Sequence, residues 1–144
     1  MGNLVTFSLE DTRALGARVA RSLVSGMVVA LNGDVGSGKT ELVRGIAAAL
    51  GSVDCVKSPS FSIVNTYRTP KITLHHFDFY RLKKSNELFE IGYDDYLADL
   101  EGVLLIEWAD MFPEMLPASN CYAIHFTAAD KDTRHLVVDD ALLA

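Results

Sequence analysis

The sequence predicts a mixed α/β fold, with a parallel core of strands, antiparallel hairpins at its edges and helices packed against the sheet. Two continuous apolar runs, residues 27–31 and 103–106, are typical of parallel strands that are buried on both faces. Segments with helical spacing of apolar residues lie between such runs. Two pairs of strand-like runs are each joined by a short polar turn, as in hairpins. We expect residues 1–144 to form a single domain, because a chain of this length is sufficient for one core.

The first elements are a strand over residues 4–7 and a helix that begins after Ser8 and runs to about residue 23. Ser8, with Asp11 three residues later, is typical of a helix N-terminus, where a side-chain oxygen accepts a hydrogen bond from a free backbone N–H. Gly26 is expected to end the helical region before the strand at residues 27–31. The expected apolar face of this helix consists of Ala14, Leu15, Val19, Ala20 and Leu23.

The most informative segment is residues 33–40, which matches the pattern G-x-x-x-x-G-K-[ST]. In such a loop backbone N–H groups point at phosphate oxygens, the lysine reaches the β- and γ-phosphates, and the final hydroxyl ligates Mg²⁺. The sequence therefore predicts that ATP or a related nucleotide binds here with Mg²⁺. The predicted cradle consists of Gly33, Asp34, Val35, Gly36, Ser37, Gly38, Lys39 and Thr40.

A helix over residues 41–50 is expected directly after the loop, and Gly51 is expected to cap it. The phosphates would then meet a helix N-terminus, where unpaired N–H groups and the helix dipole favour negative charge. We include Glu41 among the predicted nucleotide-binding residues. This context makes the predicted fold a P-loop NTPase-like mixed sheet. The alternative for residues 33–40 is an ordinary glycine turn between a strand and a helix.

The next expected elements are a hairpin and a helical region. Residues 61–67 alternate as a strand does, and a turn at residues 69–71 leads into a second strand over residues 72–78. Residues 85–100 have helical character, and Gly92 is expected to split them into two short helices. Their expected core residues are Leu88, Ile91, Tyr93, Tyr96 and Leu97.

A second hairpin is expected near the end of the chain. Residues 121–126 and 135–138 read as strands, and the polar segment 130–133 between them reads as a turn.

Two acidic residues follow predicted strands and are candidates for holding Mg²⁺. Glu107 comes directly after the apolar run 103–106, and Asp78 ends the strand over residues 72–78. Strand ends converge near the phosphate loop in such a sheet, so both carboxylates are expected to approach Thr40. We therefore predict Lys39, Asp78 and Glu107 as catalytic residues, and Thr40, Asp78 and Glu107 as metal ligands. For each acid the alternative is a carboxylate that faces water.

Other residues near these segments have two possible interpretations. The segment Ser58, Pro59, Ser60 and Phe61 lies where related folds place a loop that senses the γ-phosphate, although an ordinary Ser-Pro turn fits equally well. Arg81 would either stabilise charge on a transferred phosphoryl group or lie exposed. Trp108 would either pack near the site or belong to the core. The accessory candidates for the site are therefore Tyr80, Arg81 and Trp108.

Composition excludes several classes of function. The net charge is −6, and the only basic run is residues 81–84, which argues against tight direct binding of nucleic acid. The two cysteines, Cys55 and Cys121, form no metal-binding or disulfide pattern. His75 and His76 should face opposite sides of a strand, and we expect both to be structural. No apolar stretch approaches the ~18 residues of a membrane span, so we expect a cytoplasmic protein with no membrane contact.

Several blocks in order resemble the TsaE (YjeE) family of small bacterial ATPases over residues 33–108: residues 33–40, 57–67, 76–82, 87–92 and 105–108. The resemblance implies an ATPase, with ATP and Mg²⁺, that is required for N6-threonylcarbamoyladenosine at position 37 of tRNAs reading ANN codons. It implies that this protein acts on a complex of the TsaB and TsaD proteins and meets tRNA only indirectly. It also implies Mg²⁺ ligation by Thr40 and Glu107, with Asp78 and residues 58–61 at the catalytic edge.

The chain departs from the family pattern at two places. Ser60 stands where the family commonly has threonine, which keeps the hydroxyl, and residues 109–112 lack the proline and glycine often found there.

Two other functions remain open. A small-molecule P-loop kinase would usually carry an arginine-rich lid, whereas only Arg134 follows Arg81. A nucleotide-gated binding module would use bound ATP to order residues 58–61 without significant hydrolysis. A GTPase would ordinarily show an Asn-Lys-x-Asp motif, which is absent.

Overall fold

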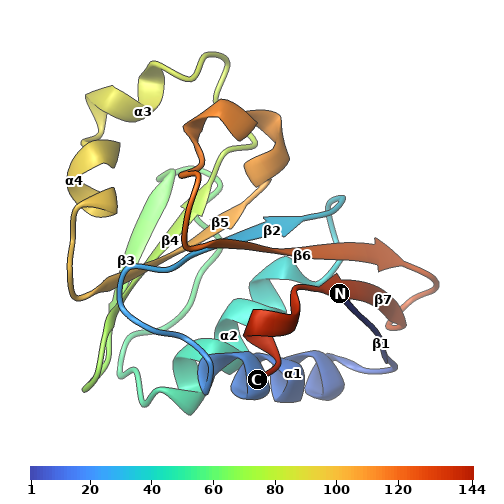
Figure 1. Cartoon of the computed structure of the whole chain (residues 1–144). Helices are drawn as coiled ribbons and strands as arrows, with labels where there is room; N and C mark the ends of the chain where they lie inside the picture. Colours follow the sequence, from blue (N-terminus) through green and yellow to red (C-terminus); the bar gives the residue numbers. More distant parts are fainter.

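The computed structural model describes residues 1–144 and contains one seven-stranded sheet in the order β1-β7-β6-β2-β5-β4-β3, with helices on both faces (Figure 1). Its strands are β1 (Gly2–Thr6), β2 (Val28–Asn32), β3 (Val64–Arg68), β4 (Thr73–Asp78), β5 (Gly102–Glu107), β6 (Cys121–Ala128) and β7 (Arg134–Val138). Its α-helices are α1 (Leu9–Ala20), α2 (Lys39–Ala49), α3 (Glu87–Glu90) and α4 (Tyr93–Leu97), with short 3₁₀ helices η1 (Ala109–Met111), η2 (Pro113–Met115) and η3 (Asp140–Leu142).

The four central strands run parallel, and both edges of the sheet are antiparallel. Strand β2 pairs in parallel with β5 and β6, and β4 pairs in parallel with β5. All residues of β2 and β5 are buried, as their continuous apolar runs predicted. The β3-β4 and β6-β7 hairpins extend the two sides, and β1 adds to β7. The predicted fold class is therefore confirmed.

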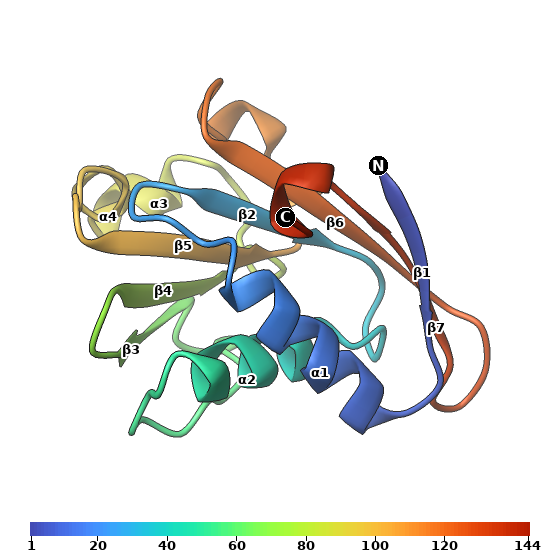
Figure 2. The same ribbon diagram turned by 60° about the horizontal axis from the view of Figure 1, so that its bottom comes forward.

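Two hydrophobic cores lie on opposite faces of the sheet. Helices α1 and α2 lie side by side across one face (Figure 2) and, with the sheet and η3, enclose a core of 20 buried residues. The other face carries a smaller core of 10 buried residues under α3, α4 and η1. Successive side chains of a strand point to opposite faces of the sheet and therefore toward different cores. The position of a polar residue in its strand thus determines the face on which it lies.

The predicted strand at residues 4–7 is shifted, and the helix after it is shorter than expected. Ser8 caps α1 as predicted, because its Oγ accepts a hydrogen bond from the backbone N–H of Asp11 at 3.0 Å. The Asp11 carboxylate in turn accepts from the N–H of Phe7 at 3.0 Å, so Phe7 belongs to the cap instead of β1. The helix ends at Ala20, where the next N–H groups turn to carbonyls three residues back. Contrary to prediction, Ala14 is exposed.

Other boundaries differ by one to three residues. Strand β3 begins at Val64 instead of residue 61, because Ile63 has a left-handed φ of 70° and donates its N–H to the carbonyl of Pro59 at 2.8 Å. Gly92, with φ 80°, separates α3 from α4 as predicted, and Gly51, also with φ 80°, follows α2 as predicted.

No helix is both long enough and apolar enough to span a membrane.

Candidate functional site

A cavity of about 400 Å³ lies where the carboxyl ends of β2, β4 and β5 meet the N-terminus of α2. Leu31 of β2 and Asp78 of β4 both pair with Glu107 of β5, so the three strands end at the same level. Apart from Leu9 and Arg134, every lining residue was predicted from the sequence. The cavity is lined by Leu9, Val35, Gly36, Ser37, Gly38, Lys39, Thr40, Glu41, Ser58, Ser60, Asp78, Tyr80, Arg81, Glu107, Trp108 and Arg134.

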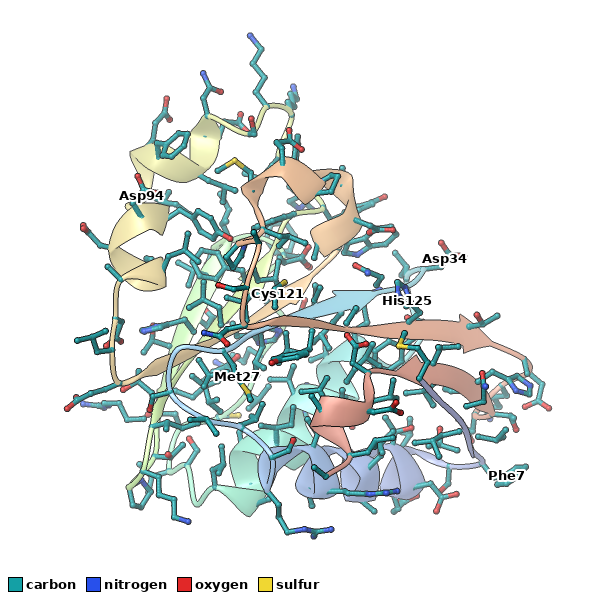
Figure 3. All side chains as sticks on the ribbon, in the orientation of Figure 1. Phe7, Met27, Asp34, Asp94, Cys121 and His125 are labelled. Carbon is teal, nitrogen blue, oxygen red and sulfur yellow. The ribbon has the colours of Figure 1, made fainter.

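The phosphate loop turns sharply from β2 into α2, and its glycines make this turn sterically possible. At Gly33, where φ is 150°, a Cβ would lie 2.8 Å from the carbonyl oxygen of Phe126 and 2.9 Å from Ser37 Oγ. Gly38 has φ 107° and its carbonyl accepts the first helical hydrogen bond, from Leu42 at 3.0 Å. Residues with a Cβ rarely adopt such angles. The Asp34 side chain extends outward from the loop (Figure 3) and does not line the cavity.

Lys39 is only 4% exposed and lies inside the loop. Its Nζ donates hydrogen bonds to the carbonyl of Gly33, to the carbonyl of Asp34 at 2.8 Å and to Ser37 Oγ at 3.3 Å. It also lies 4.5 Å from the centre of the Trp108 ring. Burial lowers the pKa of Lys39, while the nearby carboxylates of Glu107 and Asp78 act in the opposite direction. The amine is therefore held inside the loop by acceptor oxygens, which the oxygens of a bound phosphate could replace.

Both predicted acids are buried at the strand ends, each 4% exposed. Glu107 Oε2 accepts a hydrogen bond from Thr40 Oγ1 at 3.0 Å and lies 2.5 Å from His76 Nε2. Asp78 accepts from the backbone N–H of Tyr80 at 2.8 Å and from Ser60 Oγ at 3.2 Å. Burial raises the pKa of Asp78, and the charge of Glu107 contributes in the same direction. Neither carboxylate is the water-facing strand end that was the alternative interpretation.

The oxygen atoms that line the cavity are suitable ligands for an Mg²⁺ ion that is bound along with a nucleotide. No group of three or more His, Cys, Asp or Glu side chains is arranged to hold a metal ion. Mg²⁺ in proteins is usually bound through one or two carboxylates together with phosphate oxygens and water. Thr40 and Glu107, which are already in contact, fit this class of site.

The segment of residues 58–61 divides between the cavity and the surface. Ser58 and Ser60 line the cavity, and their hydroxyl oxygens lie 2.8 Å apart. Pro59 and Phe61 do not line it. The Phe61 side chain is 85% exposed, and the Arg81 guanidinium lies 4.1 Å from the centre of its ring.

Two accessory candidates pack against each other at the cavity. The rings of Tyr80 and Trp108 have their centres 4.7 Å apart. Trp108 adopts a left-handed φ of 57°, which turns the chain directly after Glu107, and its N–H donates to the carbonyl of Leu31 at 3.0 Å. It lies near the site and packs against the smaller core, so it fits both of its interpretations.

His76 lies in contact with the site, although both histidines were expected to be structural. Its ring is 0% exposed and bridges Glu107 and Tyr67, whose hydroxyl lies 2.9 Å from His76 Nδ1. His75 faces the opposite side of β4 as predicted and contacts Thr66 and Asp99. Strand alternation does place His76 on the face of Asp78, two residues on, and this signal could have found it.

Arg134 was not predicted as a site residue, and no local pattern indicates it. The β6-β7 hairpin brings it to the phosphate loop, where its Nη2 donates to the carbonyl of Gly36 at 2.8 Å. Its Nη1 donates to the carbonyls of Asp130 and Thr133, each at 3.0 Å. Arg134 is only 7% exposed, and its Nε has no hydrogen-bond partner.

Comparisons with known proteins agree on one family. The family model for the threonylcarbamoyl adenosine biosynthesis protein TsaE matches residues 6–136. The tRNA threonylcarbamoyladenosine biosynthesis protein TsaE of Bacillus subtilis is 35% identical over 127 residues, which cover 88% of this chain and 78% of the relative. The protein of the same name from Rickettsia felis is 36% identical over 114 residues, which cover 78% of this chain and 66% of the relative. The crystal structure of Bacillus subtilis YdiB superposes with a TM-score of 0.74 and 30% identity, covering 96% of this chain and 86% of that one. The chain therefore belongs to the TsaE family of tRNA threonylcarbamoyladenosine biosynthesis proteins.

Proposed function

We propose that this protein binds ATP with Mg²⁺ and hydrolyses it, slowly alone and faster with its partners. The observation that carries the proposal is the contact between Thr40 and Glu107 in a cavity that the phosphate loop and the buried Lys39 also line. These are the three side chains that a P-loop NTPase uses for the metal and the β- and γ-phosphates. The match of the family model to most of the chain supports the same conclusion.

In the proposed reaction the backbone of the loop and the N-terminus of α2 bind the phosphates. Helix α2 has 11 residues and no side-chain cap at its N-terminus, so its first N–H groups are free for phosphate oxygens. Lys39 exchanges its contacts with loop carbonyls for contacts with phosphate oxygens. Thr40 and Glu107 would hold Mg²⁺, which neutralises charge on the phosphates when bound.

Asp78 and residues 58–60 are proposed to form the catalytic edge beside the γ-phosphate. Ser60 donates to the Asp78 carboxylate, and Ser58 lies within hydrogen-bond distance of Ser60. This chain of hydroxyls and a carboxylate at the cavity wall is suited to orient an attacking water. The raised pKa of Asp78 makes it a better proton acceptor than an exposed carboxylate.

We further propose that hydrolysis serves a complex of TsaB and TsaD proteins that forms N6-threonylcarbamoyladenosine at position 37 of tRNAs reading ANN codons. The relatives are named for tRNA threonylcarbamoyladenosine biosynthesis, which supports this role. The net charge of −6 favours contact with protein partners over direct binding of tRNA. The proposed location is the cytoplasm, where these partners would act on tRNA.

The test is a reconstituted modification assay with TsaB, TsaD, tRNA, ATP and Mg²⁺, carried out with and without this protein. We expect the modified nucleoside to accumulate over many turnovers only when the protein is present, and expect the Lys39→Ala variant to fail. Unchanged multiple-turnover synthesis without the protein would refute the assignment. Phosphorylation of a sugar or nucleoside by this chain alone would favour a kinase, and binding of ATP with no hydrolysis in the full mixture would favour a gated binding module.

A further inference from the structure

A continuous line of hydrogen-bond contacts runs from the candidate metal ligands through the sheet to the segment of residues 57–60. Thr40 Oγ1 and His76 Nε2 both contact Glu107 Oε2, and the other ring nitrogen of His76 lies 2.9 Å from the Tyr67 hydroxyl. Tyr67 then contacts both backbone groups of Lys57, accepting from its N–H at 3.2 Å and lying 2.9 Å from its carbonyl oxygen. Lys57 immediately precedes Ser58, which lines the cavity.

The acceptors around Tyr67 and His76 limit where their protons can lie. The carbonyl of Lys57 already accepts a hydrogen bond from Asn65 Nδ2 at 3.1 Å. Burial raises the pKa of the Tyr67 phenol, so it keeps its proton and can donate it to His76 Nδ1. We assign the remaining ring proton of His76 to Nε2, where it is donated to Glu107. The single Tyr67 proton then serves either His76 Nδ1 or the Lys57 carbonyl, and when it points to His76 the carbonyl keeps the hydrogen bond from Asn65.

This arrangement directs one carboxylate oxygen of Glu107 toward the cavity. Both protein contacts fall on Oε2, whereas no protein group donates to Oε1. Glu107 itself lines the cavity, so Oε1 is left for a metal ion or its water. A carboxylate held by two donors on one oxygen cannot rotate freely, and such outer contacts orient metal ligands in proteins.

The neighbouring residues on the same strands form a second set of the same kind on the opposite face. Thr66 Oγ1 lies 3.0 Å from His75 Nδ1, and His75 Nε2 lies 2.8 Å from Asp99. This set combines a hydroxyl, a histidine and a carboxylate, as the first does, but it lies outside the cavity. It therefore offers a control in which the same chemistry is removed away from the site.

We propose that Tyr67 and His76 are positioning residues that hold Glu107 ready for Mg²⁺ and connect it to residues 57–60. The inference rests on the proposed function, since it concerns Mg²⁺ bound with a nucleotide. The segment has a second attachment through Ser60 to Asp78, so both predicted acids are tied to the same loop. Occupation of the metal site and ordering of residues 57–60 then favour each other, because they share the Glu107-His76-Tyr67 contacts.

The test compares Tyr67→Phe with Thr66→Val, two variants that each remove one hydroxyl at adjacent positions of β3. ADP affinity is measured by calorimetry with Mg²⁺ and with EDTA, and amide exchange of residues 57–60, except Pro59, which has no N–H, is measured in the nucleotide-free protein. For Tyr67→Phe we expect the gain in affinity due to Mg²⁺ to fall about three- to tenfold, the usual worth of one hydrogen bond. Exchange at residues 57–60 should rise, and affinity in EDTA should stay unchanged. Thr66→Val should leave all three measurements at wild-type values.

A third variant separates the two halves of the proposal. His76→Gln keeps an N–H donor for Glu107 and breaks the line to Tyr67, so the Mg²⁺-dependent affinity should be retained in large part while exchange at residues 57–60 rises. The proposal is overturned if Tyr67→Phe and Thr66→Val have the same Mg²⁺-dependent affinity, or if neither Tyr67→Phe nor His76→Gln changes exchange at residues 57–60. If wild-type protein binds no ADP at all, the proposed function fails instead, and the exchange data still decide whether the line restrains the loop.

Discussion

Replacing Thr40 by valine removes one hydroxyl and keeps the shape of the side chain, so it isolates the contact that joins the phosphate loop to β5. In the structure Thr40 Oγ1 donates to Glu107 Oε2 at 3.0 Å. A hydrogen bond to a charged group contributes about 1.5–3 kcal/mol. Thr40 is half-buried and water can replace part of this contact, so we expect a loss near the lower value, about 1–2 kcal/mol of unfolding free energy.

The effect of Thr40→Val on catalysis should be larger than the effect on stability, because the same oxygen is the proposed Mg²⁺ ligand. A fall of about a hundredfold in kcat/KM, equivalent to about 2.7 kcal/mol, is expected at saturating Mg²⁺. Steady-state hydrolysis is measured over a series of Mg²⁺ concentrations, with the TsaB and TsaD proteins present. Thr40→Ser restores the hydroxyl and should recover most of the activity. Thermal unfolding of each variant gives the matching loss of stability, about 2–4 °C per kcal/mol for a chain of this size.

Two results would show this reasoning to be wrong. Wild-type hydrolysis by Thr40→Val would mean that the hydroxyl does not serve the metal. An equal loss of nucleotide affinity in Mg²⁺ and in EDTA would mean that valine damages the phosphate cradle itself.

Three further predictions concern other parts of the site. Burial raises the pKa of Asp78 above its ordinary value of 3.8, so its charged form lowers stability at neutral pH, and this cost disappears as the pH falls below 3.8. Asp78→Asn should therefore raise the denaturant midpoint at pH 7 and lose that advantage in acid. It should also reduce hydrolysis by about a hundredfold or more. A lower midpoint at pH 7 would contradict the inference that the charge of Asp78 lowers stability. Gly33→Ala should destabilise the protein by about 1–3 kcal/mol in denaturant titrations, because its Cβ would lie 2.8 Å from the Phe126 carbonyl. Gly36→Ala, with no atom within 4 Å of its Cβ, should cost less, and equal costs would exclude the steric cause. Arg134→Met removes the donor to the Gly36 carbonyl and should weaken ADP binding about five- to tenfold by calorimetry, whereas unchanged affinity would assign Arg134 to the β6-β7 turn alone.

The sequence patterns that predicted structure well were those whose cause is local. The continuous apolar runs became β2 and β5, Ser8 became a helix cap, and Gly92 divided α3 from α4, because neighbouring residues set each of these outcomes. Boundaries were less accurate where a distant or competing contact intervened. The N–H of Phe7 donates to the Asp11 carboxylate, so β1 ends before Phe7. The N–H of Ile63 donates to the Pro59 carbonyl, so β3 begins after Ile63.

Contacts between distant segments accounted for what the sequence analysis missed. The partner of β1 is β7, at the other end of the chain, and no property of either segment specifies that pairing. Arg134 reaches the phosphate loop only because the β6-β7 hairpin lies beside β2. His76 and His75 have different partners because β5 places Glu107 on one face of the sheet and the turn after α4 places Asp99 on the other.

Local patterns in the sequence were enough to predict the class of fold, the phosphate loop and the two strand-end acids beside it. These follow from glycine conformations, helix polarity and burial of apolar runs, which act over a few residues. Three features of the site became visible only in the folded chain: Thr40 and His76 share one oxygen of Glu107, Lys39 lies against Trp108, and Tyr67 connects this cluster to Lys57. Such contacts depend on the order and register of strands in the sheet, which bring together side chains far apart in the chain.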